Sequence, residues 1–576
     1  MPGDSLDHLA QKLHDHLARD PNLCVIRGIE RNLGERNLGE LPDPSDAAAN
    51  DRARDAEALR RQFEALDRDA LSFDDALDAD LAELILGAQA HDESVTFNGR
   101  SARSQTPRAG DDIGDGIFLL MANDPRPEHD RLADITSRLE RVPDYLSALA
   151  ARLDRPVARW VGMDLEKVGE LPSLFATIAE RAEATGFADA GRLESARERA
   201  EGALARYADA LRAMDTTTSF HVGEKTARRI VELKGIDRPL EELHGWAREF
   251  LASTGEAIEE LRGELAAKYG LDSSVTVADV HRELNRRYRV RPPDGGDVIE
   301  AVLARYRDER DRVLEFIRER DLFPIPDDQD MEIVRTPSFM APSIPAGAMM
   351  SPPPFRAGVR KSLIYLTLSE ELLDEHTELG IPSMIIHEGI PGHHLQLATA
   401  ATHPSIIRRH VDAMEQAEGW TTMLEDYMLD IGYMGELTSE ARFSTYRELS
   451  RIGARVAIDL FFMTGDKGYL EVGVDCDLSS DDPFEAAGKL LAEVTGFGSG
   501  RVQAELNWYS QERGYPLCYL TGNRLVNELK RDMAAAQRGS LDGLELDRRF
   551  HDTYLRAGSM PVAHLRRVFE HEGLVD

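Results

Sequence analysis

Residues 387–396 read His-Glu-Gly-Ile-Pro-Gly-His-His-Leu-Gln, and this stretch carries the strongest functional signal in the chain. His387, Glu388, His393 and His394 stand within eight residues of one another, directly after the apolar run 381–386. Histidine is the commonest protein ligand for zinc, and a carboxylate beside a ligating histidine is the usual base for a metal-bound water. The stretch therefore predicts a metal site of the hydrolytic kind, at the point where a buried element opens.

The spacing of the histidines differs from the H-E-x-x-H pattern, in which two histidines four residues apart face one metal from a single helix. Here Pro391 stands four residues after His387, and the next histidines follow at six and seven. On a straight helix His393 would point ~120° away from His387, and His394 would lie ~10 Å further along the axis. Proline cannot donate the backbone hydrogen bond of a helix interior, so we expect Pro391-Gly392 to distort or break the helix and swing a second histidine toward the metal. We favour His393 as that ligand, and His394 is the alternative.

A third protein ligand is expected, because a catalytic zinc site holds three protein groups and keeps the fourth position open. In the gluzincin arrangement this ligand is a glutamate on a following helix. Glu418 lies 25 positions beyond His393 (418 − 393), at the start of a strongly helical run. The Gly-Trp pair after it indicates close packing, not a free surface. Glu425 and Asp426, two turns further along, are candidates to hold the second ring nitrogen of a ligating histidine.

Across these residues the chain resembles the DUF885 family, a group placed with the zincin-like metallopeptidases. The shared pattern is close to H-E-x-x-P-G-H-H-x-Q followed by E-G-W, and it covers His387, Glu388, Pro391, Gly392, His393, His394, Gln396, Glu418, Gly419 and Trp420. The likeness continues through Arg451, Arg455 and Asp459 and into the C-terminal part. It implies a mainly α, zincin-like helical metallopeptidase fold and one divalent metal per chain, with Zn²⁺ expected and other divalent metals as alternatives. It supplies no substrate.

Tyr519 and His551 are the candidates to stabilise the oxyanion of a tetrahedral intermediate, a role that phenols and imidazoles share in zincins. For each, the alternative is a buried residue with a satisfied polar tip. Two departures from the family pattern affect this region. A histidine usual after Asp459 is missing here, and the segment 514–519 reads Gly-Tyr-Pro-Leu-Cys-Tyr in place of the family's Pro-Gly-Gln-Ala before the tyrosine.

These parts together predict a metal-dependent hydrolase, in which His387, His393 and Glu418 hold the metal and Glu388 is the general base. We expect a peptidase that cleaves peptide bonds of short peptides, with a peptide or small amide as its substrate. Two alternatives remain open at this point. One is a metal-dependent amidase or esterase acting on a non-peptide metabolite, and the other is a non-catalytic metal-binding scaffold.

The charge of the chain restricts its environment and its partners. It carries 69 basic and 104 acidic side chains, a net charge of −35 and a pI near 4.9, and about nine of the basic residues are lysine. An acidic surplus with little lysine keeps a protein hydrated in concentrated salt, where screening weakens self-repulsion. We therefore expect a halophilic, cytoplasmic protein, with an ordinary acidic surface as the alternative. The sign of the charge argues against nucleic-acid binding.

Other features favour the same location. Cys24, Cys476 and Cys518 lie far apart without a C-x-x-C pair, which favours free thiols over a disulfide framework. The first residues lack the basic and apolar regions of a signal peptide, and no run of about 18 apolar residues occurs, so no membrane segment is expected. Some DUF885 relatives look like exported lipoproteins, and this chain is not expected to be one. The sequence leaves the oligomeric state open.

Two parts of the chain are expected: a helical N-terminal lobe over residues 1–325 and a metal-binding catalytic lobe over residues 326–576. The first reads as long amphipathic helices, such as 239–268 and 298–320, and it is expected to cover one side of the cleft and limit the substrate to short or flexible peptides. Residues 362–367 alternate as a strand does and predict a small β-sheet beside the metal site. We interpret this strand as a sheet edge that pairs with extended peptide substrate, with an ordinary short sheet as the alternative.

Three arginines recur at intervals of four residues in a helical stretch: Arg447, Arg451 and Arg455. One face of that helix is therefore cationic. Such a stripe binds a substrate carboxylate in some proteins, and in others its arginines pair with neighbouring carboxylates. The sequence leaves both roles open.

Overall fold

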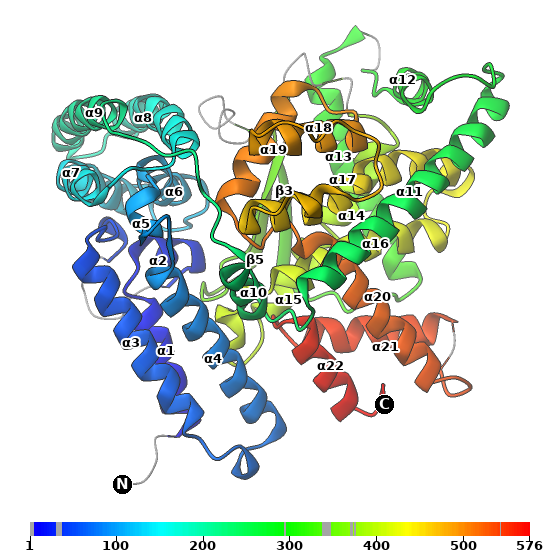
Figure 1. Cartoon of the computed structure of the whole chain (residues 1–576), viewed down its shortest axis with the longest axis horizontal. Helices are drawn as coiled ribbons and strands as arrows, with labels where there is room; N and C mark the ends of the chain where they lie inside the picture. The colour runs from blue at the N-terminus through cyan, green and yellow to red at the C-terminus, as the bar shows by residue number, and fades with distance from the viewer. Residues whose placement is uncertain are drawn as a thin grey trace.

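Helices account for most of the chain, which confirms the mainly α prediction (Figure 1). The computed structural model describes residues 5–29, 37–292, 295–336, 347–368, 373, 376–541 and 543–576. The elements of the N-terminal half are α1 (Leu6–Leu17), α2 (Pro21–Arg27), α3 (Asp46–Glu64), α4 (Phe73–Ser94), β1 (Thr96–Phe97), β2 (Arg100–Ser101), α5 (Ala102–Gln105), α6 (Ala109–Ala122), α7 (Glu128–Arg152), α8 (Ala158–Ala184), α9 (Ala190–Arg212), α10 (Glu224–Leu233), α11 (Leu240–Tyr269), α12 (Val277–Tyr288) and α13 (Val298–Glu319).

The second half begins with a small sheet and continues with helices. Its elements are β3 (Gln329–Arg335), β4 (Gly347–Met350), β5 (Arg360–Leu366), α14 (Gly380–Glu388), α15 (His393–Ala400), α16 (Met414–Asp430), α17 (Thr438–Thr464), α18 (Pro483–Thr495), α19 (Ser499–Gln511), α20 (Cys518–Ala536), α21 (Gly543–Arg556) and α22 (Val562–His571). The long helices α11 and α13 lie where the amphipathic pattern predicts them. Many helices start at a side chain that caps their free N–H groups, as Ser5, Ser45 and Ser72 do for α1, α3 and α4.

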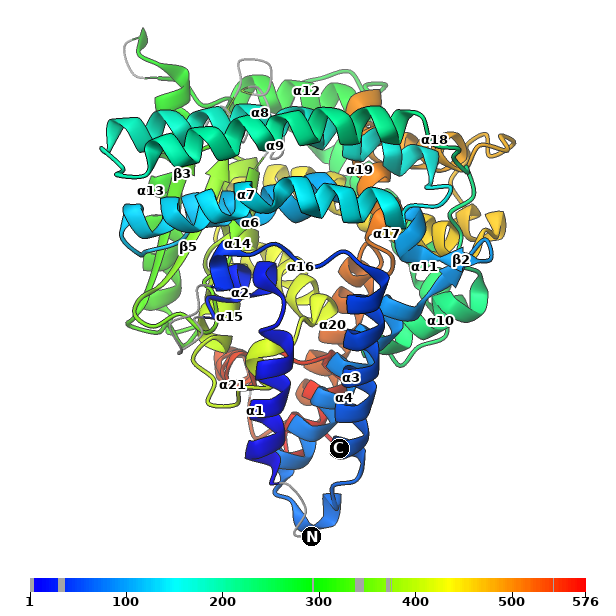
Figure 2. The same ribbon diagram turned by 90° about the vertical axis from the view of Figure 1, so that its left-hand side faces the viewer.

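Helices α1–α9 lie on one side of the molecule, and α10–α13 lie among the C-terminal helices (Figure 1). Figure 2 shows α7, α8 and α9 running side by side across one face, with α3 and α4 as an antiparallel pair below them. Figure 1 shows that the sheet and the C-terminal helices lie on the other side.

In the described part of the chain, three large clusters of buried apolar side chains hold these helices together, and a small fourth one lies at Leu363 and Tyr365 of β5. The largest joins α1, α3 and α4 to α13–α16 and α20–α22. A second lies among α10, α11 and α17–α20, and a third joins α2 to α6–α9. The first cluster takes side chains from both sides of position 325, so the N-terminal helices share a core with the C-terminal ones. The division into lobes 1–325 and 326–576 stays a prediction.

The small sheet has the strand order β3-β5-β4, with β3 parallel and β4 antiparallel to β5. The strand expected over 362–367 is present as β5, but its predicted place at the sheet edge is wrong, because it pairs on both sides. Its side chains from Ser362 to Leu366 are all buried, as those of a central strand are. A single segment does not show how many partners it pairs with, and both partners lie elsewhere in the chain.

Candidate metal centre

The predicted break in the metal motif is confirmed. α14 ends at Glu388, the residue after His387. The Ile390–Pro391 peptide is cis, and α15 begins at His393. Gly392 lies against the end of α14, where a Cβ atom would approach the carbonyl oxygen of His387 to 2.0 Å. Only glycine allows so close an approach of two backbones. The bend therefore folds the start of α15 back onto the end of α14 and brings the two histidines together.

The E-G-W sequence on α16 holds this bend in place. The indole Nε1–H of Trp420 donates to the carbonyl oxygen of Pro391 at 2.9 Å. Beside it, Gly419 packs directly on α20, and a Cβ at this position would lie 2.4 Å from the carbonyl carbon of Gly522. The glycine lets α16 and α20 touch, and the tryptophan ties α16 to the metal motif.

His387, His393 and Glu418 form a candidate metal-binding triad, called the triad below. The Nε2 atoms of His387 and His393 lie 3.6 Å and 3.4 Å from Oε2 of Glu418, and all three ligand atoms lie within 4.8 Å of one another. Oε2 of Glu418 is buried and has no hydrogen-bond partner among the described residues. A buried carboxylate oxygen that faces two imidazole nitrogens needs a cation, and this donor set is one that zinc accepts.

The pKa shifts of the triad residues also indicate a site for a positive charge. Burial by itself lowers the pKa of His387, but Glu418 and Glu425 outweigh it and raise that pKa. Burial raises the pKa of the Glu418 carboxyl, but His393 and His387 outweigh it and hold that pKa below its usual range. The carboxylates therefore create a position that favours positive charge, whether that charge is carried by a proton or by a metal.

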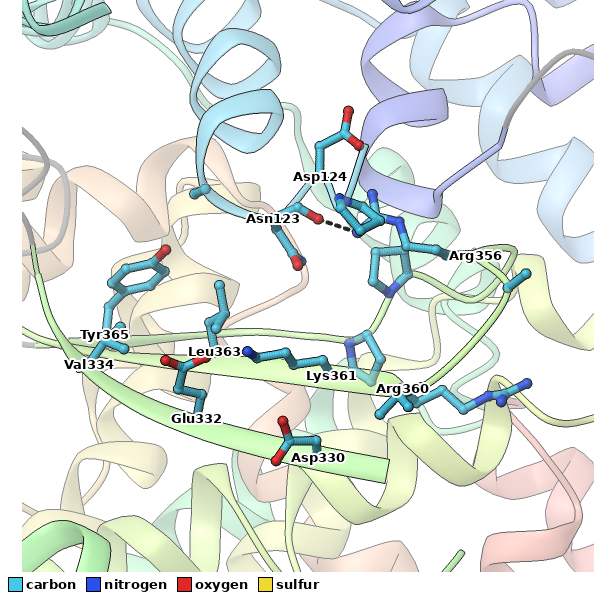
Figure 3. Close-up of a pocket in the computed structure, with 16 residues that line it drawn as sticks. Asn123, Asp124, Asp330, Glu332, Val334, Arg356, Arg360, Lys361, Leu363 and Tyr365 are labelled. Atoms are coloured by element: carbon cyan, nitrogen blue, oxygen red, sulfur yellow. Dashed lines mark hydrogen bonds and ion pairs between the residues drawn. The ribbon is translucent and has the colours of Figure 1, made fainter. Parts of the chain in front are cut away.

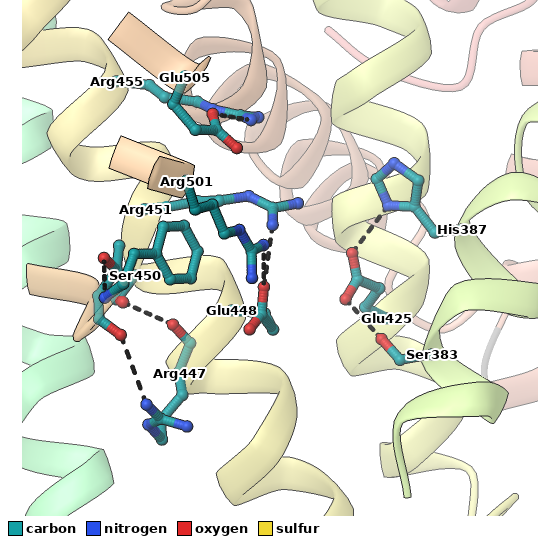
Figure 4. Close-up of polar contacts among 12 residues, drawn as sticks. Ser383, His387, Glu425, Arg447, Glu448, Ser450, Arg451, Arg455, Arg501 and Glu505 are labelled. Atoms are coloured by element: carbon teal, nitrogen blue, oxygen red, sulfur yellow. Dashed lines mark hydrogen bonds and ion pairs between the residues drawn. The ribbon is translucent and has the colours of Figure 1, made fainter. Parts of the chain in front are cut away.

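Glu425 orients the first histidine. Nδ1–H of His387 donates to one oxygen of Glu425 at 2.9 Å, and the hydroxyl of Ser383 donates to the other at 2.8 Å (Figure 4). This assigns the proton of a neutral His387 to Nδ1 and leaves its Nε2 lone pair directed at the triad. Asp426, the other candidate for this role, instead pairs with Arg442 at 3.1 Å.

A tyrosine that the sequence did not single out contacts the triad. The hydroxyl of Tyr515 donates to Oε1 of Glu418 at 2.9 Å. The turn that presents Tyr515 is held by Asp459 of α17, which accepts from the backbone N–H groups of Gly514 and Leu517, both at 3.1 Å. Nothing in the spacing marks Tyr515, because its partner lies 97 residues away on another helix.

Tyr519 lies next to Tyr515, and His551 does not reach the triad. The rings of Tyr519 and Tyr515 are nearly parallel, with centroids 5.9 Å apart. Burial, followed by the Glu418 carboxylate, raises the pKa of Tyr519, so its hydroxyl stays protonated and able to donate. His551 is fully buried, donates Nδ1–H to the carbonyl oxygen of Leu322 at 2.9 Å and stacks on Phe323. Among the described residues, no hydrogen bond or ring contact joins His551 to the triad.

His394 turns away from the metal centre. Its Nδ1 accepts from the hydroxyl of Ser362 at 2.7 Å, and its Nε2–H donates to Oε1 of Gln329 at 2.5 Å. Both ring nitrogens are thus used to join α15 to β5 and β3, and burial lowers the pKa of His394 to about 4. The structure brings His393, not His394, to the triad.

Glu388 follows the first histidine and is half-buried. Within the described part of the chain its carboxylate forms no hydrogen bond or ion pair, so it is available for proton transfer.

A cavity of about 660 Å³ lies on the face of the sheet opposite to His394 (Figure 3). Its walls include Glu332 of β3, Lys361 and Tyr365 of β5, and Asn123 after α6. In β5, Ser362 points to the opposite face, toward His394. None of the lining residues belongs to the triad, so this cavity is separate from the candidate metal centre.

Comparison with known proteins identifies the family. The family described as "Bacterial protein of unknown function (DUF885)" matches residues 28–569, so the chain belongs to the DUF885 family. No curated protein matches the chain.

Two solved structures share the fold and are each described as a "putative lipoprotein". One is from Shewanella oneidensis, with a TM-score of 0.76, 17% identity and coverage of 98% of this chain and 100% of that chain. The other is from Colwellia psychrerythraea, with a TM-score of 0.78, 16% identity and coverage of 99% of this chain and 98% of that chain. At these identities the likeness shows the fold alone.

These descriptions contradict the cytoplasmic location expected from the sequence, and that prediction is withdrawn. The expectation rested on net charge, on three separate cysteines, and on the composition of the first residues and of the apolar runs. Net charge and cysteine spacing do not report whether a lipid anchors a chain. In the described part of the structure, no helix combines the length and apolar character needed to cross a membrane.

Proposed function

We propose that this member of the DUF885 family is a metal-dependent hydrolase, a zinc peptidase with a zincin-like site that cleaves peptide bonds of short peptides. One observation carries the proposal: His387, His393 and Glu418 converge on one point, and the free carboxylate of Glu388 stands next to them in sequence. A purely structural zinc site uses four protein ligands and needs no neighbouring base.

Each side chain has a role in this scheme. A zinc ion bound by the triad would supply an activated water and polarise the carbonyl group of the substrate. Glu388 takes the proton of the attacking water and passes it to the leaving amine. The hydroxyl of Tyr519 donates to the carbonyl oxygen as negative charge develops on it. Glu425 keeps His387 in the required tautomer, and Tyr515 holds Glu418.

The sheet offers a place for an extended peptide. β4 pairs only with β5 among the described residues, so its other edge is the candidate for strand addition by an extended peptide. β4 also lies against the helix that carries the first ligand, since a Cβ at Gly347 would lie 3.0 Å from the side chain of Met384 on α14. This edge takes over the role that the sequence had suggested for residues 362–367.

The first test is the metal content of the purified protein and of His393→Ala, Glu418→Ala and His394→Ala. We expect about one zinc per chain in the wild type and in His394→Ala, and loss of zinc in the other two. His394→Ala is the matched control, because it removes a neighbouring imidazole that is bonded elsewhere. If the wild type does not bind zinc even after reconstitution, the proposal is wrong.

The second test is catalysis. Zinc-loaded protein is offered a library of short peptides together with acylated amines and esters, and Glu388→Gln is the matched variant. We expect peptide cleavage to fall by at least ~10³-fold in Glu388→Gln while zinc is retained. Turnover of the acylated amines or esters alone would assign an amidase or esterase in place of a peptidase. Equal rates in both proteins would leave the scaffold as the better account.

A further inference from the structure

Four arginines gather on α17 and α19, and Figure 4 draws them in one view with His387 and Glu425. We call Arg447, Arg451, Arg455 and Arg501 the arginine cluster. Two carboxylates pair with it, those of Glu448 and Glu505. Four guanidinium groups and two carboxylates leave two uncompensated positive charges (4 − 2) in a chain whose net charge is −35. A protein this acidic has many carboxylates, so a local surplus of arginine indicates a site for an anion.

Two arginines of the cluster already bind the carboxylate of Glu448. Oε2 of Glu448 accepts from Nη1 of Arg451 at 2.9 Å and from Nη2 of Arg501 at 3.2 Å. The Glu448 side chain is 47% exposed, so it can swing into solvent. A second carboxylate could then take its place without leaving either guanidinium unpaired.

Deeper in the arginine cluster, buried donors lack acceptors. Arg455 is only 5% exposed and uses Nε and Nη2 on Tyr509 and Glu505, both at 2.9 Å. Its Nη1 is buried without a partner in the described part of the chain, and so is Nε of Arg451. Folded proteins leave few buried N–H donors unpaired, so these two indicate a missing acceptor. Arg447 is also without a carboxylate among the described residues, and donates to the carbonyl oxygen of Thr495 at 3.4 Å.

Two tyrosines connect the arginine cluster to the triad. The guanidinium of Arg455 lies 4.3 Å from the ring centroid of Tyr519, which stacks on Tyr515. The hydroxyl of Tyr515 in turn donates to Glu418. These contacts link Arg455 to the triad through Tyr519, the proposed oxyanion donor.

We propose that the arginine cluster binds a carboxylate of the substrate in the place that Glu448 occupies. The inference rests on the proposed hydrolase function and narrows its substrates to short peptides or acylated amino acids with a free carboxylate near the scissile amide. That carboxylate has two sources, the C-terminus of the peptide and an acidic side chain. Both offer the same planar acceptor to the guanidinium groups, so the test has to separate them.

The test measures binding, so it does not depend on turnover. Zinc-loaded Glu388→Gln protein is titrated by calorimetry with four probes: N-acetyl-Ala-Ala, its C-terminal amide, N-acetyl-Ala-Glu amide and N-acetyl-Ala-Gln amide. We expect at least one acid to bind tenfold or more tightly than its neutral counterpart. The first pair reports recognition of the C-terminus, and the second reports recognition of an acidic side chain.

The arginine variants are made in the same background. Arg451→Gln and Arg501→Gln should each reduce the preference for the acid to less than threefold, and Arg451→Lys should restore part of it. Arg192→Gln is the matched control, since Arg192 pairs with Glu140 at 2.6 Å on the surface of α9 and α7. It should leave the preference unchanged. If Arg451→Gln does not fold, Arg501→Gln decides, because the Arg501 side chain is 39% exposed.

Equal binding of acids and amides overturns the inference, and so does a preference that survives both arginine variants. Hydrolysis by the zinc-loaded wild type is recorded separately. Cleavage of acids and amides at equal rates would leave the proposed function standing and remove this inference. Selective binding of an acid without any cleavage would support the carboxylate site and remove the proposed hydrolase function.

Discussion

Gly392 lies against the backbone of His387, so close that a Cβ atom would stand 2.0 Å from the carbonyl oxygen of that residue. This contact shapes the candidate metal centre, because it lets two short helices meet at an angle that directs His387 and His393 to the same point. A continuous helix with the same sequence spacing would direct these side chains apart.

Gly392→Ala is expected to disrupt this bend, because the added carbon collides with backbone that cannot move away. We expect a loss of about 3 kcal/mol or more in the free energy of unfolding, together with loss of zinc. Denaturant unfolding and metal analysis measure the two effects. The control is Gly162→Ala on α8, where a Cβ meets nothing within 4 Å and where alanine should stabilise by ~0.5–1 kcal/mol. Zinc binding by Gly392→Ala at wild-type affinity would contradict this account of the bend.

Glu425→Gln is expected to weaken zinc binding by ~10–100-fold, because the carboxylate that orients His387 is lost. Competition with a chelator of known affinity measures the change. Asp426→Asn is a control at the next position, since Asp426 pairs with Arg442 and not with the triad. Equal losses in the two variants would mean that general disturbance of α16, and not the bond to His387, is responsible.

The two tyrosines should separate metal binding from catalysis. Tyr519→Phe removes the proposed donor to the oxyanion, so we expect kcat to fall by ~10²-fold with zinc content unchanged. Tyr515→Phe leaves Oε1 of Glu418 without its hydrogen bond, so we expect weaker zinc binding as its main effect. Kinetics at saturating zinc, set beside metal titrations, distinguish the two. The reverse pattern would exchange the assigned roles.

His551 is expected to act on acid stability. Burial, followed by the charge of Lys530, lowers the pKa of His551 to about 3, although the bond to Leu322 opposes this. Between that value and the unfolded pKa of ~6.5 the unfolded chain binds the extra proton, so stability falls as the pH falls through this window. Full separation of the two values corresponds to a loss in the free energy of unfolding on the order of 5 kcal/mol.

His551→Gln removes this titration, so its free energy of unfolding should depend less steeply on pH between about 4 and 6.5 than that of the wild type. Denaturant unfolding at several pH values measures the two slopes. Parallel slopes would show that His551 is not held neutral by its buried position.

The sequence by itself determined the parts of the candidate metal centre that depend on residue type and short spacing. Two histidines with an adjacent Glu388 indicated a metal site, and Pro391 predicted the break between α14 and α15. The Glu-Gly-Trp sequence marked Glu418, because a glycine and a tryptophan beside a ligand indicate close packing. Amphipathic periodicity likewise predicted α11 and α13, because a 3.6-residue repeat is a local property.

Only the tertiary structure decided which side chains meet. It excluded His394 by bonding it to Ser362 and Gln329, the latter 65 residues away, and it placed His551 in an aromatic core. It also brought Tyr515 to Glu418 and made β5 a central strand. Each of these outcomes depends on contacts between segments far apart in the chain, formed when separate helices and strands bury a common core. Local spacing does not encode such contacts.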